Sequence, residues 1–155
     1  METNRLRPGS ILESHLGYWL RHVSNHVSSG FKRALETRQT SVAEWVVLCH
    51  VHERPGITPG ELAQALAFTR GAVSKIIDKL EAKRWITAST HPADSRVRPY
   101  SLTRWGSRVL PELRQIADQN DHTFFNVLPD NERATLQRLL LKLIERHAIQ
   151  GAPVE

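Results

Sequence analysis

Residues 58–80 of the chain read TPGELAQALAFTRGAVSKIIDKL, and this stretch decides the fold. Thr58 and Glu61 have the spacing of a capping box, with Pro59 at the first helical position, so we expect a short helix to begin there. After a brief turn at Ala67-Phe68, Thr69 is expected to cap another helix, whose apolar residues recur every three or four positions. Two short helices joined by such a turn form a helix-turn-helix unit. The segment therefore predicts that unit in the middle of the chain.

Helical patterns also precede this unit. Apolar residues spaced three or four apart predict one long amphipathic helix from about Ser10 to Glu36. A helix of roughly 25 residues is roughly 38 Å long, so we expect part of its apolar face to contact something beyond a compact monomer. Ser41 and Glu44 then match a capping box that opens a second helix, which we expect to stop before Pro55.

A β-hairpin is expected after the helix that Thr69 caps. Residues 85–90 are rich in large apolar, Thr and Ser side chains, and apolar and polar side chains alternate again in residues 96–102. The stretch from His91 to Ser95 between them has turn chemistry. Pro99 indicates that the second strand is an edge strand, since proline cannot donate a hydrogen bond to a neighbouring strand.

The C-terminal part again has a helical pattern. Thr103 is expected to cap a long helix that runs to about Val127, and Pro111 should kink this helix or displace its regular start. Pro129 and Asp130 are expected to begin a last amphipathic helix. The predicted fold class is therefore mostly α with a small β-hairpin wing.

Positive charge is concentrated in the middle third of the chain. The sequence has 155 residues and a formal net charge of +5. Residues 54–108 carry ten Lys and Arg against four Asp and Glu, whereas residues 1–53 carry six against five and residues 109–155 five against seven. A local excess of this kind is expected of a surface that binds nucleic-acid phosphates, although a solvated basic face has the same pattern.

The fourth predicted helix is the candidate DNA reader. An α-helix fits the major groove of B-DNA, and residues at its N-terminal end reach the base edges. Arg and Lys can donate to guanine or phosphate, hydroxyl groups can bond to either, and small residues permit close approach. With the apolar residues facing inward, the outer face carries the predicted DNA-binding residues Thr69, Arg70, Gly71, Ala72, Ser74, Lys75 and Lys79.

The hairpin supplies a second group of predicted DNA-binding residues, Asp94, Ser95, Arg96 and Arg98. An arginine at a hairpin tip can enter the narrow minor groove, where the potential is most negative, and Asp94 can orient its planar guanidinium. The same residues also fit a plain turn with solvated surface charge.

The segment DSRVRPYSLTRWG at residues 94–106 resembles the D-x-R…L-T-x-x-G wing signature of the MarR family of bacterial regulators. Leu80-Glu81-Ala82-Lys83 before it and the order of elements from about Ser10 to His147 are similar too. The resemblance implies a triangular, mostly helical homodimer in which the first, fifth and sixth helices intertwine and two winged helix-turn-helix domains read a pseudo-palindromic operator. It also implies that the helix from Thr69 reads the major groove and that the Arg96 wing enters the minor groove.

The resemblance also divides the chain. Residues 1–40 are expected to form an N-terminal dimerisation helix, residues 41–104 a winged helix-turn-helix DNA-binding domain, and residues 105–155 the C-terminal dimerisation helices. One position departs from the family, where glycine usually follows the residue equivalent to Lys83, whereas Arg84 stands here. Either Arg84 adopts a backbone geometry that is unfavourable for a side chain, or the helix ends differently.

Candidate effector residues lie on the first two predicted helices. Members of the family commonly respond to small aromatic acids, to oxidants or to metals. Aromatic walls with a few polar groups suit a small aromatic acid, although tryptophans at helical spacing are also typical of a core. The predicted effector pocket is lined by His15, Trp19, His22, Trp45 and Cys49.

Two other sensing chemistries stay open. Cys49 has apolar neighbours and is expected to be a buried, unreactive thiol, but His50 and His52 flank it. His22 and His26 lie four residues apart, a spacing at which two imidazoles can share a metal ion. Neither a defined metal site nor an organic cofactor is predicted.

The sequence therefore predicts a ligand-responsive transcriptional repressor that binds double-stranded DNA as a homodimer. The alternative is a winged-helix adaptor that contacts other proteins and has no specific DNA binding. Because no phosphate loop, nucleophile elbow or metalloprotease motif occurs, we predict no enzymatic activity and no catalytic residue. The chain has a single cysteine and lacks both an apolar N-terminal stretch and an apolar run of about 18 residues, so we expect a cytoplasmic protein without membrane contact.

Overall fold

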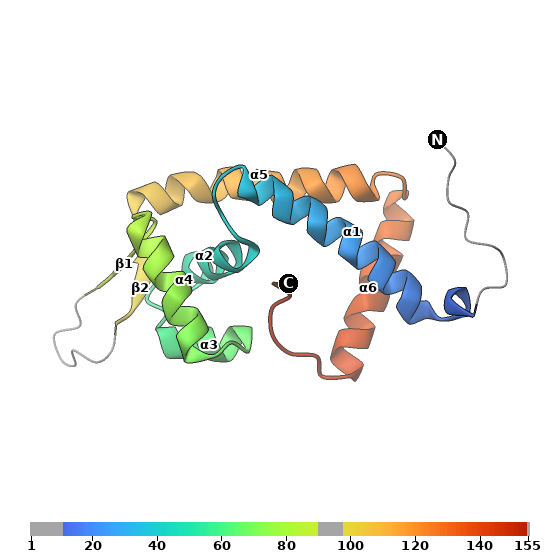
Figure 1. The fold of residues 1–155 in the computed structure, drawn as a ribbon, viewed down its shortest axis with the longest axis horizontal. Helices are drawn as coiled ribbons and strands as arrows, with labels where there is room; N and C mark the ends of the chain where they lie inside the picture. The colour runs from blue at the N-terminus through green and yellow to red at the C-terminus, as the bar shows by residue number, and fades with distance from the viewer. Residues whose placement is uncertain (1–10, 90–97, 155) are drawn as a thin grey trace.

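The computed structural model describes residues 11–89 and 98–154, and Figure 1 shows their arrangement. The fold is mostly helical with one small β-hairpin, which confirms the predicted class. In chain order the elements are a short 3₁₀ helix (Leu12–Ser14), α1 (Leu16–Glu36), α2 (Val42–Glu53), α3 (Pro59–Leu66), α4 (Arg70–Ala82), β1 (Ile86–Ala88), β2 (Tyr100–Leu102), α5 (Arg104–Phe125) and α6 (Asp130–Arg146).

The helix-turn-helix unit forms as its capping residues predict. Thr58 Oγ1 accepts a hydrogen bond from the Glu61 N–H at 3.3 Å, and Glu61 Oε2 accepts one from the Thr58 N–H at 2.8 Å, so a complete capping box begins α3. Ala67 adopts a left-handed backbone with φ of 54° and ends this helix. Thr69 Oγ1 then accepts a hydrogen bond from the Ala72 N–H at 3.1 Å and begins α4. Both predicted helix starts are confirmed.

One hydrophobic core joins α2, α3, α4 and the hairpin to the first half of α5 and the last turn of α1. Ser41 and Glu44 begin α2 with the predicted capping box, and the apolar residues that follow in this helix lie in the core. The left-hand part of Figure 1 shows these elements packed together. The buried apolar residues are Leu35, Val47, Leu48, Val51, Ile57, Leu62, Ala63, Leu66, Val73, Ile77, Leu80, Ile86, Tyr100, Leu110 and Leu113.

The predicted hairpin is confirmed, with shorter strands than expected. β1 and β2 are antiparallel, and Ile86 lies opposite Leu102. The second strand is also attached to the segment before α3, because the Tyr100 N–H donates to the Ile57 carbonyl at 2.9 Å and the Gly56 N–H donates to the Tyr100 carbonyl at 2.8 Å. These bonds fix the base of the wing against the helix-turn-helix unit.

The end of α4 settles the two alternatives at Arg84, which adopts the left-handed backbone with φ of 60°. The Trp85 N–H donates a hydrogen bond to the Leu80 carbonyl at 3.0 Å. Helix ends with this bond usually have glycine at the left-handed position. Gly106 packs against this turn so closely that a Cβ atom there would lie 2.0 Å from the Trp85 carbonyl oxygen. Thr103 Oγ1 donates to the Arg84 carbonyl at 2.5 Å and accepts from the Gly106 N–H at 3.1 Å. The Thr-x-x-Gly sequence thus fixes the start of α5 onto the end of α4.

The single helix predicted from about Ser10 is wrong at its start. Residue 10 lies outside the described part, Leu12–Ser14 is a 3₁₀ turn, and His15 has an extended backbone with φ of −106° and ψ of 122° before α1 begins. The physical reason is local. Ser14 Oγ and His15 Nδ1 both donate a hydrogen bond to the Ile11 carbonyl, at 2.7 and 2.8 Å. In a continuous helix this carbonyl would instead accept from a backbone N–H, so the side-chain bonds replace the helical one.

The two C-terminal helices begin where the sequence predicts. Thr103 caps α5, and Pro129 directly precedes α6. Pro111 does not displace the start of α5, which runs through it to Phe125. Of the two alternatives at Pro111, the displaced start is therefore wrong, and a kink stays a prediction.

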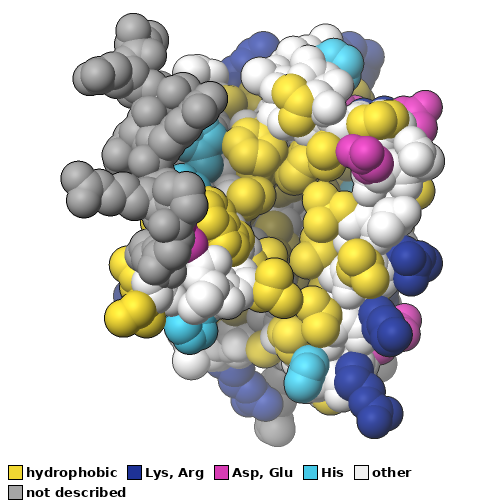
Figure 2. All heavy atoms as spheres, turned by 90° about the vertical axis from the view of Figure 1, so that its right-hand side faces the viewer, with side chains coloured by type: hydrophobic (Ala, Val, Ile, Leu, Met, Phe, Trp, Pro, Cys, Tyr) yellow, Lys and Arg dark blue, Asp and Glu magenta, His cyan; other side chains and the backbone are white. Residues whose placement is uncertain are grey.

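Apolar side chains are exposed at the end of the molecule that lies opposite the hairpin. Figure 2 looks onto this end and shows many hydrophobic side chains gathered on it. No residue of α6 is buried in this chain. In the part of the sequence that the structure describes, none of the helices combines the length and apolarity needed to cross a membrane. The exposed large apolar residues of α1, α6 and the 3₁₀ turn are Ile11, Leu12, Leu16, Trp19, Leu20, Val23, Leu139, Leu141, Leu143 and Ile144.

Candidate nucleic-acid interface and the adjoining groove

The outer face of α4 carries all seven residues that the sequence assigns to it. The apolar side of the helix is turned into the core, with Val73, Ile77 and Leu80 buried. The opposite side is open to solvent along the whole helix. Its exposed residues are the seven predicted ones, Thr69, Arg70, Gly71, Ala72, Ser74, Lys75 and Lys79, together with Asp78.

The three cations on this face are available to an external partner. Arg70, Lys75 and Lys79 form no ion pair with any carboxylate in residues 11–89 and 98–154. The first amide groups of α4 add a partial positive charge at the end where Arg70 lies. Together these groups make a positive surface shaped as a protruding helix, which is the form that fits a major groove.

Arg98 has a different environment from the one predicted for a wing residue. Its Nη2 lies 3.6 Å from Glu81 Oε1 of α4, and its guanidinium lies 5.7 Å from the centre of the Tyr100 ring. The side chain is still 60% exposed. Arg98 therefore links the base of the wing to α4, while Asp94, Ser95 and Arg96 lie outside the described residues.

A buried ion pair joins the end of α4 to the start of α2. Lys83 Nζ lies 2.8 Å from Glu44 Oε1, donates to the Gln39 carbonyl at 2.6 Å, and lies 4.7 Å from the centre of the Trp85 ring. Glu44 Oε2 accepts from the Ser41 N–H at 2.7 Å. Burial of Glu44 raises its pKa, but the hydrogen bonds from Lys83 and Ser41 outweigh this effect, and the net pKa is lowered. Glu44 is therefore held ionised between the two helices.

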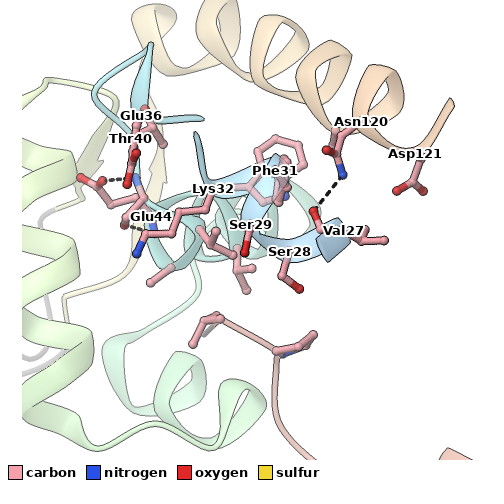
Figure 3. A pocket seen from close by; sticks show the side chains of 18 of the residues that line it. Val27, Ser28, Ser29, Phe31, Lys32, Glu36, Thr40, Glu44, Asn120 and Asp121 are labelled. Carbon is pink, nitrogen blue, oxygen red and sulfur yellow. Dashed lines mark hydrogen bonds between the residues drawn. The ribbon is translucent and has the colours of Figure 1, made fainter. Parts of the chain in front are cut away.

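A groove of about 1010 Å³ lies beside this ion pair, between α1, α2 and α5, with Pro153 and Val154 of the C-terminal segment as a further wall. Phe31 and Trp45 meet edge to face, with ring centres 6.4 Å apart. Figure 3 shows Phe31, Lys32 and Ser29 of α1 with Asn120 and Asp121 of α5 around this space. Asn120 Nδ2 donates to the Val27 carbonyl at 3.4 Å, which joins α1 to α5 at the upper edge.

Of the five residues predicted to line an effector pocket, only Trp45 lines this groove. His15, Trp19 and His22 lie at the N-terminal end of α1, where the Trp19 Nε1–H donates to the Glu13 carbonyl at 2.9 Å and His22 stacks on Tyr18. Cys49 is half-buried against the core. The five residues are thus not brought together within this chain.

The sensing chemistries left open by the sequence receive no support from the local environments. Burial and the neighbouring Glu53 raise the pKa of the Cys49 thiol to about 11, although Arg114 opposes them, so the reactive thiolate is scarce at neutral pH. Within the described residues, no three His, Cys, Asp or Glu side chains are placed to hold one metal ion.

The groove residues that the sequence reasoning missed are mainly Phe31 and Lys32 of α1 and Asp118, Asn120 and Asp121 of α5. Asp118 and Asp121 are three residues apart and share one face of α5, which is a local signal that could have been noticed. Whether that face lies near Phe31 depends on how α1 crosses α5, and no local sequence pattern predicts this crossing.

Comparisons with known proteins agree with this architecture. Residues 38–97 match a model of the MarR family. The multiple antibiotic resistance protein MarR of Salmonella typhimurium is 31% identical over 105 residues, which cover 67% of this chain and 73% of that protein. Crystalline MarR from E. coli in its apo form superposes with a TM-score of 0.71 at 27% identity, over 84% of this chain and 97% of that one.

A further solved structure is that of BpsR from Bordetella bronchiseptica, studied for the regulation of its DNA binding by 6-hydroxynicotinic acid. It superposes with a TM-score of 0.73 at 26% identity and covers 88% of this chain and 97% of its own. The relatives are regulators of transcription. With its helix-turn-helix unit, its hairpin and its long flanking helices, the chain belongs to the MarR family of transcriptional regulators.

Proposed function

We propose that this chain is a sequence-specific repressor that binds a pseudo-palindromic operator as a homodimer and releases it when a small ligand binds. α4 enters the major groove, and the wing that includes Arg96 enters the adjacent minor groove. Residues 41–104 act as the DNA-binding domain, and residues 1–40 and 105–155 form the dimer. The observation that carries this proposal is the exposed outer face of α4, on which Arg70, Lys75 and Lys79 have no carboxylate partner among the described residues.

The surface of the chain supports the homodimer. No residue of α6 is buried, and Leu139, Leu143 and Ile144 remain 43% to 49% exposed. Apolar surface of this extent is typical of a permanent interface between subunits. Sedimentation equilibrium is expected to give twice the mass of one chain, and a monomer at micromolar concentration would contradict the proposal.

The position of the groove supports control by a ligand. It lies where the long helices α1 and α5 meet α2 of the DNA-binding domain. A ligand that binds one relative position of these parts better than another shifts the population toward it. The DNA binding of BpsR, at 26% identity, is regulated by 6-hydroxynicotinic acid, whose aromatic ring favours an aromatic ligand here as well.

Specific DNA binding is tested by fluorescence anisotropy with labelled DNA from upstream of the chain's own gene. Three exposed cations on α4 in each of two copies give six expected contacts, so the log–log slope of affinity against salt is expected to be about −5. A winged-helix adaptor without specific DNA binding is the alternative function. It would show neither this slope nor a preference over unrelated DNA.

Variants assign the binding to α4. Arg70→Ala and Lys75→Ala are each expected to weaken specific binding by about 1–3 kcal/mol if they contact base edges. Arg138→Ala removes the same charge from α6, on the side away from Leu140 and Leu143, and is expected to leave affinity unchanged. Arg96→Ala is expected to weaken binding as well. Full affinity in both α4 variants would refute the assignment of the reading helix.

A further inference from the structure

The groove between α1, α2 and α5 has a negative charge that an aromatic acid would oppose. Its lining includes four carboxylates, on Glu36, Glu44, Asp118 and Asp121, and one ammonium, on Lys32. Glu44 is neutralised by Lys83 at 2.8 Å. The charge of Lys32 balances that of Glu36, which follows it by one helical turn. Asp118 and Asp121 then give the groove two net negative charges.

The two aspartates of α5 have no cationic partner within the described residues, since none of the ion pairs there includes them. The Asp121 side chain is exposed, but its partial desolvation, and then the repulsion of the Asp118 carboxylate, raise its pKa. A carboxylate in this environment gains from an added positive charge and loses from an added negative one. The local potential of the groove is therefore selective for the sign of a ligand's charge.

The other walls of the groove suit a flat aromatic ring. Phe31 and Trp45 present an aromatic corner, and Val27, Val46 and Ala117 add apolar surface. Trp45 is half-buried, so its ring keeps an accessible part on the groove side. An aromatic face attracts a cation through its quadrupole, and tryptophan does so most strongly. Ring stacking and charge thus favour the same type of molecule.

We propose that the ligand of this groove is a small aromatic cation, such as a quaternary or protonated ring nitrogen compound, and not an aromatic acid. The proposal rests on the proposed function only in taking this groove as the regulatory site. The aromatic part of the ligand lies against Phe31 and Trp45, and its positive charge lies toward Asp118 and Asp121. This class differs from the small aromatic acid that the family resemblance led us to expect.

The test is isothermal titration calorimetry of the full chain without DNA, with two bicyclic aromatic probes of similar size and opposite charge. N-methylquinolinium is the cation and 2-naphthoate the anion. We expect the cation to bind at least about tenfold more tightly, the size of effect expected when aromatic and carboxylate groups act together at a partly solvated site.

Two double variants locate the charge effect. Asp118→Asn with Asp121→Asn is expected to bring the affinities of the two probes within about twofold of each other, because it removes the two unpaired charges. Glu53→Gln with Asp78→Asn removes two exposed carboxylates outside the groove and is expected to keep the preference. Thermal melting of each variant checks that it is folded.

Three results would overturn the proposal: an anion that binds as tightly as the cation, no binding of either probe at millimolar concentration, or a preference that survives in the Asp118 and Asp121 variant. None of these results affects the DNA titrations, which use no ligand. A chain that binds the cation and fails to bind DNA would instead contradict the proposed function.

Discussion

Replacing Lys83 by methionine is expected to strand the Glu44 carboxylate between α2 and α4. Lys83→Met keeps the length and apolar part of the side chain but removes the ammonium, which lies 2.8 Å from Glu44 and 2.6 Å from the Gln39 carbonyl. The Glu44 side chain is 5% exposed, so water cannot fully replace the lost cation. Removing one partner of a fully buried pair costs about 3–5 kcal/mol.

The cost here is expected to be smaller, about 2–3 kcal/mol, because Lys83 is partly solvated and Glu44 keeps its bond from Ser41. The side chain of Lys83 is 25% exposed, and the Ser41 N–H bond to Glu44 measures 2.7 Å. Urea unfolding at pH 7, followed by circular dichroism, measures the loss. The double variant Lys83→Met with Glu44→Gln contains no buried charge, and glutamine can still complete the capping box. It is therefore expected to be more stable than Lys83→Met alone.

The same pair gives a signed pH dependence. The pKa of Glu44 is lowered from its ordinary value of 4.5, so the pair stabilises the folded chain above that value and is lost as the pH falls through the folded pKa. In Lys83→Met, burial raises the pKa of Glu44 and the main opposing effect, the bond from Lys83, is gone. The stability difference between the two proteins is thus expected to be largest at pH 7 and to shrink as the pH falls through 4.5. A pH-independent difference, or a double variant no more stable than Lys83→Met, would refute the stranded-charge explanation.

Two further substitutions and one labelling experiment test other features of the structure. Gly106→Ala is expected to destabilise the chain by about 3 kcal/mol or more in urea unfolding, because its Cβ would lie 2.0 Å from the Trp85 carbonyl oxygen. Gly17→Ala is the control, since no atom lies within 4 Å of the added carbon. Equal effects of the two substitutions would contradict the contact. Arg84→Gly is expected to raise the free energy of unfolding by about 0.5–1 kcal/mol, since φ is 60° there, and a loss would show that the arginine side chain matters more than its backbone. Cys49 in the folded chain is expected to react with iodoacetamide at pH 7.4 more than about 100-fold slower than free cysteine, because its pKa is about 11; rapid labelling would reopen redox sensing.

Local chemistry explains which helices could be predicted. Ser41, Thr58, Thr69 and Thr103 each accept a hydrogen bond from the N–H three residues later, and each marks a helix start that the sequence predicts correctly. α1 lacks such a residue, since His15 provides no capping bond, and its start was predicted wrongly. The spacing of the apolar residues extends to the N-terminal side of Leu16, so periodicity without a capping residue located the helix but not its start.

The two surfaces of the molecule differ in how far the sequence could predict them. The α4 face could be predicted because one helix supplies all its residues and its apolar stripe fixes which side is exposed. The groove takes residues from α1, α2, α5 and the C-terminal segment, so its composition depends on how these elements pack. Gly30 illustrates the difficulty, because a Cβ there would lie 2.9 Å from Asn120 Oδ1, a contact across 90 positions of sequence. Trp45 was found because aromatic residues are conspicuous, whereas Asp118 and Asp121 gain their meaning only from what faces them.

Glu44 forms part of the groove wall and also holds the end of α4, so a change of charge there would affect stability and ligand binding together. Its carboxylate caps α2 through Ser41, binds Lys83 at the end of α4, and forms part of the groove wall. A substitution there alters the fold, the position of the reading helix and the potential of the groove together. Asp118 and Asp121 lie on the opposite wall and form no ion pair among the described residues, so their replacement changes the potential alone. A shift in ligand preference in that variant, with unfolding unchanged, therefore reports the charge of the groove and not the integrity of the domain that α4 belongs to.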